Sequence, residues 1–159
     1  MEKLTFEKFD KILRGKTIIL GIGNIMRGDD GVGPILISRL KGNIKAGLLD
    51  CGEVPENYTQ PIIEAGPDNI IIVDAADWNG LVGEKRLIDV EEIHNVSTST
   101  HNSSLQIFIN YLKKHLPNTD VIIIGIQSKR NAFLDSLSPE VERTVDELCY
   151  LFSASPSPV

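Results

Sequence analysis

Four short apolar runs, each ending in or beside glycine or an acidic residue, constrain the fold more than any other feature of this sequence. They are Thr17–Gly23, Gly47–Cys51, Asn69–Ala75 and Asp120–Gly125. Runs of this length that are rich in Ile and Val suit strands buried on both faces, which is typical of a mostly parallel sheet. Apolar residues recur with helical spacing at 32–40, 105–112 and 141–151. This alternation predicts an α/β sandwich with helices on both faces of the sheet.

The remaining segments fit around that sheet. Glu84–Ile88 predicts a short strand, placed at a sheet edge because it is rich in charge. Residues 1–16 predict an additional amphipathic helix that packs beside the first strand, and Ser138 followed by Pro139 predicts the start of the last helix. Ser153–Val159 is polar and proline-rich, which predicts a frayed tail. Because the sequence has no internal repeat and no linker, we expect one domain of 159 residues.

Charge and cysteine content narrow the class of protein. The chain has 16 Lys and Arg against 22 Asp and Glu, a net charge of −6, and no basic run to hold a phosphate backbone or an anionic membrane. Cys51 and Cys149 form neither a disulfide framework nor a CxxC pair. The N-terminus lacks the apolar core of a signal peptide, and no apolar run approaches the roughly 20 residues that cross a bilayer. We therefore expect a cytoplasmic monomer that binds no nucleic acid and does not insert into membranes.

The glycine-rich segment Gly21–Pro34 follows the first predicted strand and is the clearest candidate site. A dinucleotide-binding loop needs a third glycine where this chain has Met26. Asp29 and Asp30 lie near the start of the next helix, where they would repel a pyrophosphate, and helix capping is the favoured role for Asp29. Asp50, at the end of the second strand, could imitate the acid that binds a ribose. A dinucleotide-binding α/β protein is therefore the weaker alternative.

Four side chains with metal-binding chemistry are expected at one edge of the sheet. Asp30 follows the first strand, Asp50 ends the second, Asp74 ends the third, and His101 precedes a helix. Ligands of open parallel sheets bind beyond the carboxyl ends of the strands, and two carboxylates with an imidazole suit a divalent transition metal. Structural roles stay open: Asp30 as a helix cap, Asp50 as a turn residue or as a hydrogen-bond partner of the ligands, His101 as a neighbour of a helix cap. Asp74 ends an apolar strand and needs a specific partner.

Cys51 suggests a different scheme, a cysteine nucleophile with His101 as its base. Several acidic residues lie close to Cys51 in the sequence, and they raise a thiol pKa and oppose thiolate formation. A small buried hydrophobe is the favoured role. His94 and His115 are expected at the surface. No GxSxG or HExxH motif is present, so the serine-hydrolase and zincin templates do not apply.

Five motifs together resemble those of the [NiFe]-hydrogenase maturation endopeptidases. In chain order they are GIGNIMRGDDGVGP at 21–34, DCGEVPEN at 50–57, IIVDAAD at 71–77, STHN at 99–102 and GIQ at 125–127. The likeness runs from about Thr17 to Leu148, and the chain departs from it at Cys51-Gly52, where many relatives have two glycines. The resemblance implies a three-layer α/β/α sandwich with a mostly parallel central sheet. It also implies a protease that removes a C-terminal extension from a [NiFe]-hydrogenase large-subunit precursor after nickel insertion.

The resemblance further implies roles for individual residues. An acid, an aspartate and a histidine that recognise nickel in this family correspond to Asp30, Asp74 and His101, and the family's aspartate after the second strand corresponds to Asp50. The nickel is expected to belong to the substrate, with no organic cofactor in the protease. It would position the scissile region and act as a Lewis acid on the carbonyl or on the attacking water. A non-catalytic nickel-binding maturation factor that uses the same residues is the second alternative.

Overall fold

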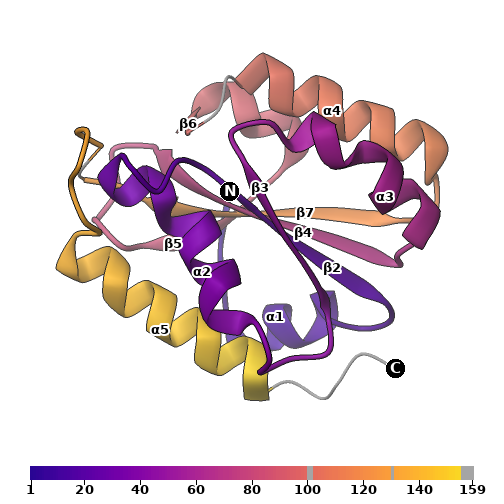
Figure 1. Cartoon of the computed structure of the whole chain (residues 1–159), viewed down its shortest axis with the longest axis horizontal. Helices are drawn as coiled ribbons and strands as arrows, with labels where there is room; N and C mark the ends of the chain where they lie inside the picture. Colours follow the sequence, from indigo (N-terminus) through magenta and orange to yellow (C-terminus); the bar gives the residue numbers. More distant parts are fainter. Residues whose placement is uncertain (100–101, 130, 155–159) are drawn as a thin grey trace.

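A mixed sheet with helices on both faces forms the centre of the molecule (Figure 1). The computed structural model describes residues 1–99, 102–129 and 131–154. The strands are β1 (Glu2–Lys3), β2 (Thr17–Ile22), β3 (Gly47–Gly52), β4 (Asn69–Asp77), β5 (Lys85–Ile88), β6 (Ser97–Thr98) and β7 (Asp120–Gln127). The α-helices are α1 (Phe6–Ile12), α2 (Val32–Leu40), α3 (Thr59–Ala65), α4 (Asn102–His115) and α5 (Pro139–Ala154). Short 3-10 turns are η1 (Gly28–Gly31), η2 (Pro55–Tyr58) and η3 (Val90–Asn95).

The strand order is β1-β5-β7-β4-β2-β3, with the short β6 paired to the end of β4. The four strands from β7 to β3 are parallel, whereas β5 pairs antiparallel with β7, and β1 pairs antiparallel with β5. All four apolar runs identified in the sequence are strands of the parallel part. The mostly parallel sheet and the α/β class are therefore confirmed, with antiparallel strands added.

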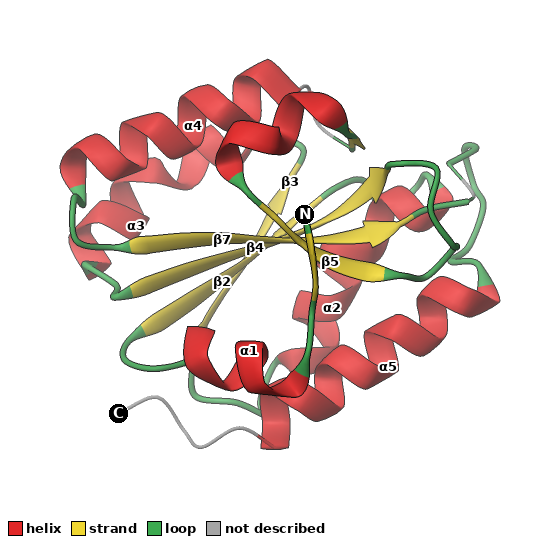
Figure 2. Ribbon diagram, turned by 180° about the vertical axis from the view of Figure 1, so that it is seen from behind, coloured by secondary structure: helices red, strands yellow, loops and turns green. Residues whose placement is uncertain are grey.

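Side chains of β4 alternate between two hydrophobic cores. Ile71 and Val73 pack in the core under α1, α2 and α5, while Ile70 and Ile72 pack in the core under α3 and α4 (Figure 2). Each fully buried side chain of this size contributes about 1.5–3 kcal/mol relative to exposure, which explains why the run is apolar at successive positions. By the same alternation Asp74 points toward the α4 layer, at the carboxyl end of the sheet.

Two predicted elements, the strand at Glu84–Ile88 and the helix over residues 1–16, differ from the structure. The segment Glu84–Ile88 contains β5, but β5 is not an edge strand because β7 pairs with one side of it and β1 with the other. The predicted helix over 1–16 forms only at Phe6–Ile12, since Glu2–Lys3 pair with β5. A two-residue strand of charged residues has no apolar periodicity by which a sequence could reveal it.

The C-terminal helix α5 continues to Ala154, so the first two residues of the predicted tail are helical, and residues 155–159 lie outside the described part of the chain. In the parts that the structure describes, no helix combines the length and apolarity needed to span a bilayer.

Candidate active site

The glycine-rich segment after β2 folds into a loop that hydrogen-bonds to itself. The Asn24 N–H donates to the Asp30 carbonyl over 3.0 Å, the Met26 N–H to the Asn24 side-chain oxygen over 2.9 Å, and the Asp30 N–H to the Arg27 carbonyl over 3.1 Å. A phosphate-binding loop needs such amides free to face the ligand. Their internal use argues against the dinucleotide alternative.

Close backbone contact explains two of the glycines. A Cβ at Gly33 would lie 2.5 Å from the carbonyl oxygens of Ile22 and Val73, so glycine lets α2 pack directly on β2 and β4. A Cβ at Gly23 would lie 1.7 Å from the Asp30 carbonyl oxygen, and Gly23 has a φ of 140° that other residues rarely adopt. The glycine pattern therefore brings Asp30 against the carboxyl ends of the central strands.

Asp29 is fully buried and joins the glycine-rich loop to the segment between β7 and α5. Its carboxylate accepts hydrogen bonds from the Lys129 N–H at 2.8 Å, the Ser138 N–H at 2.7 Å and the Ser138 hydroxyl at 2.9 Å. Neither η1 nor α2 has a side-chain cap at its N-terminus, so the predicted capping role of Asp29 is wrong. The partners of Asp29 lie about a hundred residues later in the chain, where local sequence signals do not reach.

Asp74 is the buried acid of the site. Only 1% of it is exposed, its Oδ1 accepts the Ser99 hydroxyl, and its Oδ2 has no hydrogen-bond partner among the described residues. Burial raises the pKa of Asp74 well above its ordinary value, and the charge of Asp30 raises it further, whereas the Ser99 hydrogen bond lowers it. The expected specific partner of Asp74 is therefore Ser99, and one carboxylate oxygen is left for another ligand.

Asp30 lies close enough to Asp74 for the two charges to interact. It is half-buried, and burial is the main cause that raises its pKa. Arg27 opposes this rise, whereas Asp29 and Glu53 add to it. Two neighbouring carboxylates whose ionised forms are both disfavoured would be stabilised by a bound cation. The structure thus brings together two of the four predicted site residues.

The segment that leads to His101 is fixed next to Asp74. Thr98 pairs with Ala76 at the end of β4, and the Asn102 side chain accepts from the Thr98 N–H at 3.3 Å and its hydroxyl at 2.8 Å. The same amide donates to the carbonyls of Ile93, at 3.0 Å, and Val96. Asn102 therefore holds the loop from which Ser99 reaches Asp74. His101 itself lies outside the described residues, so its predicted role stays a prediction.

Asp50 takes the turn role that the sequence left open. Its side chain is exposed and accepts the Gly52 N–H at 3.0 Å. Asp50 also lines a hollow of about 250 Å³ together with Asn24, Ile25 and Glu53. Glu53 was not singled out from the sequence; its place one residue after β3, within the DCGEVPEN motif, was the available signal.

Cys51 has the buried role favoured from the sequence. Only 3% of the residue is exposed, and burial, helped by the charge of Asp50, raises the pKa of the thiol to about 12. A thiol with this pKa is not a thiolate at neutral pH, so a cysteine nucleophile is not supported. His94 and His115 are exposed, as expected.

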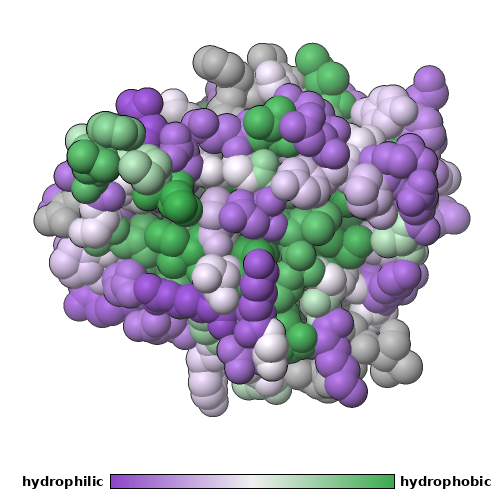
Figure 3. Space-filling view, in the orientation of Figure 1, coloured by the Kyte–Doolittle hydropathy of each residue, from purple (hydrophilic) through white to green (hydrophobic). Residues whose placement is uncertain are grey.

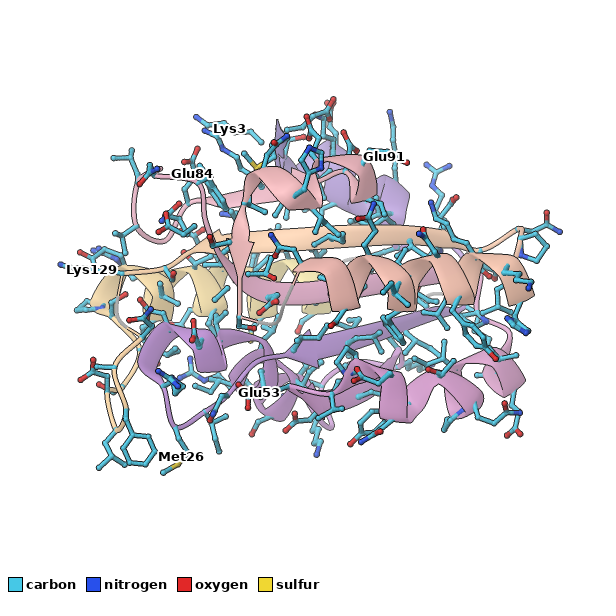
Figure 4. The ribbon with its side chains drawn as sticks, turned by 90° about the horizontal axis from the view of Figure 1, so that it is seen from above. Lys3, Met26, Glu53, Glu84, Glu91 and Lys129 are labelled. Atoms are coloured by element: carbon cyan, nitrogen blue, oxygen red, sulfur yellow. The ribbon has the colours of Figure 1, made fainter. Side chains whose placement is uncertain are left out.

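Exposed apolar side chains lie on the two loops next to the site, the glycine-rich loop and the segment between β7 and α5. Ile25 and Met26 belong to the glycine-rich loop, Phe133 and Leu134 to the segment between β7 and α5, and each is 43–70% exposed. We call these four residues the apolar patch. Figure 3 shows hydrophobic atoms gathered at the left of this face, where the β7–α5 segment lies in Figure 1. Met26 and Glu53 lie along the same side of the molecule in Figure 4.

Within residues 1–99, 102–129 and 131–154, no three His, Cys, Asp or Glu side chains are grouped so that they could hold a metal ion. Of the predicted ligands, Asp30 and Asp74 are the two carboxylates that lie in the described part of the chain. A metal at this position would need further ligands from His101, from a bound molecule or from both.

We compared the chain with known protein families, curated proteins and solved structures. Residues 35–153 match the HycI family of hydrogenase maturation proteases. The Hydrogenase 3 maturation protease of Escherichia coli K12 is 34% identical over 132 residues, which cover 81% of this chain and 83% of that protein. The crystal structure of the [NiFe] hydrogenase maturation protease HycI from Thermococcus kodakarensis superposes with a TM-score of 0.81 at 30% identity, covering 91% of this chain and 95% of that one.

The solution structure of the endopeptidase HycI from Escherichia coli gives a TM-score of 0.74 at 31% identity, over 87% of this chain and 89% of that chain. The resemblance noted from the five motifs is thereby confirmed, and with it the enzyme class, a hydrolase that cleaves polypeptides. The family-model match, the structural superpositions and the sequence identities all indicate the same family. This protein belongs to the hydrogenase maturation protease family.

Proposed function

We propose that this protein removes the C-terminal extension of a [NiFe]-hydrogenase large-subunit precursor after nickel has been inserted. The observation that carries the proposal is a pair of carboxylates, Asp74 near the carboxyl end of β4 and Asp30 in η1, which packs against β4. Asp74 is buried, one of its oxygens has no hydrogen-bond partner among the described residues, and Asp30 is near enough for its charge to act on Asp74. Buried carboxylates in this arrangement are costly unless a cation or a proton compensates them.

In this proposal the nickel belongs to the substrate. Asp30, Asp74 and His101 contact a metal that the precursor already holds through its own ligands. This fits a described donor set that is too small to hold a metal ion by itself. The elevated pKa of Asp74 means that a proton can occupy the site in the absence of metal, and metal contact then displaces that proton. Precursor without nickel would bind less well.

The nickel would serve as a template that orients the scissile peptide, and as a Lewis acid toward the carbonyl or the attacking water. Asp50, exposed in the hollow beside the site, would contact the polypeptide next to the cleaved bond. We assign the reaction to a cytoplasmic monomer without an organic cofactor, in keeping with the acidic composition of the chain.

The test is to incubate the purified protein with nickel-loaded and with nickel-free precursor and to follow precursor size on a gel. We expect a size decrease for the nickel-loaded form only. Equal cleavage of both forms would refute metal recognition. Nickel transfer without cleavage would favour the non-catalytic maturation factor. His94→Ala, at an exposed position on η3, is the matched control for His101→Ala.

A further inference from the structure

The apolar patch takes no part in the reaction proposed above. Its four side chains, Ile25, Met26, Phe133 and Leu134, are exposed and come from two loops that are far apart in the sequence yet hydrogen-bonded to each other. Single exposed apolar residues are ordinary on protein surfaces, whereas a group of them next to a functional site marks a surface that binds another molecule.

Hydrogen bonds hold the two loops of the patch together. The Leu134 N–H donates to the Met26 carbonyl over 2.7 Å, and the Gly28 N–H donates to the Asp135 carbonyl over 3.1 Å. Asp29 adds a clamp, because it accepts the amides of Lys129 and Ser138 on either side of the second loop. A surface fixed in this way loses little conformational entropy when a partner binds.

Leu134 is held in an unfavourable backbone conformation. Its φ is 67°, in the left-handed region that leucine rarely occupies, and 70% of the residue is exposed. The side chain therefore gains no free energy from burial that could offset the cost of its backbone conformation. Strain of this kind is retained where it serves a binding or catalytic surface.

The patch is continuous with the candidate active site. Ile25 lines the hollow that also contains Asp50 and Glu53, and Asp30 follows five residues later in the same loop. At about 250 Å³ this hollow is smaller than the sites that enclose a drug-sized ligand, so it holds only a short stretch of polypeptide. Recognition of one folded precursor needs additional contact area next to it.

We propose that the apolar patch docks against an apolar surface on the folded body of the hydrogenase large-subunit precursor, beside the extension that enters the hollow. This inference rests on the proposed function. It assigns the hollow to the tail and the patch to the body of the same substrate. Recognition of the body would then be separable from recognition of the tail.

The test uses the double variant Phe133→Ser/Leu134→Asn. Asparagine tolerates a positive φ better than leucine does, so the variant is expected to keep the thermal stability of the wild type. The matched control is Leu81→Asn/Tyr150→Ser, which removes two apolar side chains that are 80% and 71% exposed elsewhere on the molecule. Affinity is measured by calorimetry for nickel-loaded precursor and for a peptide that contains only the extension and its flanking residues.

We expect the double variant to bind the precursor at least about tenfold more weakly, as loss of central apolar contacts does in protein interfaces, with peptide binding unchanged. The control should bind both like the wild type. Unchanged precursor affinity in the double variant would overturn the docking surface, and an equal loss for the peptide would overturn its assignment to the body. So would a concentration-dependent dimer that the double variant abolishes, since the patch would then bind a second copy of this chain.

Binding and cleavage are scored separately. Wild-type protein that binds the precursor but does not cut it refutes the proposed function while the affinities still decide the docking surface. Wild-type protein that does not bind the precursor refutes both.

Discussion

Asp29 and Asp30 are adjacent in the chain, but we expect their replacement to have opposite consequences. Asp29 is fully buried, and both of its oxygens accept hydrogen bonds, one from the Ser138 N–H and the other from the Lys129 N–H and the Ser138 hydroxyl. Asp30 is half-buried and is disfavoured in its charged form by burial. The first side chain holds the fold together, whereas the second belongs to the proposed reaction.

The magnitudes follow from these contacts. Asp29→Asn keeps one acceptor oxygen and turns an NH₂ group toward a donor, so at least one buried amide loses its partner, at a cost of about 1–3 kcal/mol. Asp29→Ala removes both oxygens, and we expect a loss of about 4 kcal/mol, which corresponds to roughly 8–16 °C in Tm for a chain of this size. Asp30→Asn should change stability by less than about 0.5 kcal/mol, or raise it slightly, because it removes a charge that burial disfavours.

Thermal unfolding followed by circular dichroism, with urea unfolding for the free energy, measures the stability of all three variants at pH 7. Processing of nickel-loaded precursor is measured at a temperature where each variant is folded. We expect Asp30→Asn to fold like the wild type and to lose processing. If Asp29→Ala melts within about 2 °C of the wild type, or if Asp30→Asn is destabilised as much as Asp29→Asn, the division of roles is wrong.

Three further predictions concern the loop and the buried acid. Asp74 has a raised pKa when folded, so its contribution to stability is complete below its ordinary value of 3.8 and is lost as pH rises toward the folded value. Asp74→Asn should therefore be more stable than the wild type at pH 7, with the difference vanishing near pH 4 in urea titrations, and it should not process precursor. His101→Ala should melt like the wild type yet lose at least about tenfold in processing rate, while His94→Ala processes normally; wild-type processing by His101→Ala refutes the three-residue site. Asn102→Ala should lose about 2 kcal/mol and speed hydrogen exchange at Thr98, and unchanged exchange there would show that Asn102 does not hold the loop.

The fold was predictable where the signal was local. The central strands and the helices α2, α4 and α5 have apolar patterns that belong to one element each, and both faces of β4 are buried, which gives a continuous run such as Asn69–Ala75. The pairing of β5 was not predictable, because its partner β1 consists of two charged residues at the start of the chain, far from β5 in the sequence. Helix α3 is only seven residues long and has no side-chain cap at its N-terminus to mark its start.

For the site, the sequence predicted which residues lie at the carboxyl edge of the sheet, but not which of them are close to each other. Strand ends placed Asp30 and Asp74 together, since parallel strands end at the same edge. The sequence assigned Asp30 to the site and a helix cap to Asp29, but it could not show that Asp29 binds Ser138, about a hundred residues away. It also gave no sign that Asp50 would be exposed in a hollow beside Glu53 rather than next to the buried acid.

The clamp formed by Asp29 connects the two surfaces proposed to contact the precursor. Asp30, next to Asp29, is near enough for its charge to act on the buried Asp74, while the segment between Lys129 and Ser138 carries Leu134. A variant at Leu134 should therefore raise KM for the precursor with kcat preserved, and a variant at Asp30 should lower kcat. Asp29→Asn loosens both surfaces at once, so it should raise KM and lower kcat together even at temperatures where it is fully folded. If Asp29→Asn changed only one of the two constants, the glycine-rich loop and the β7–α5 segment would be positioned independently, and the clamp would contribute to stability alone.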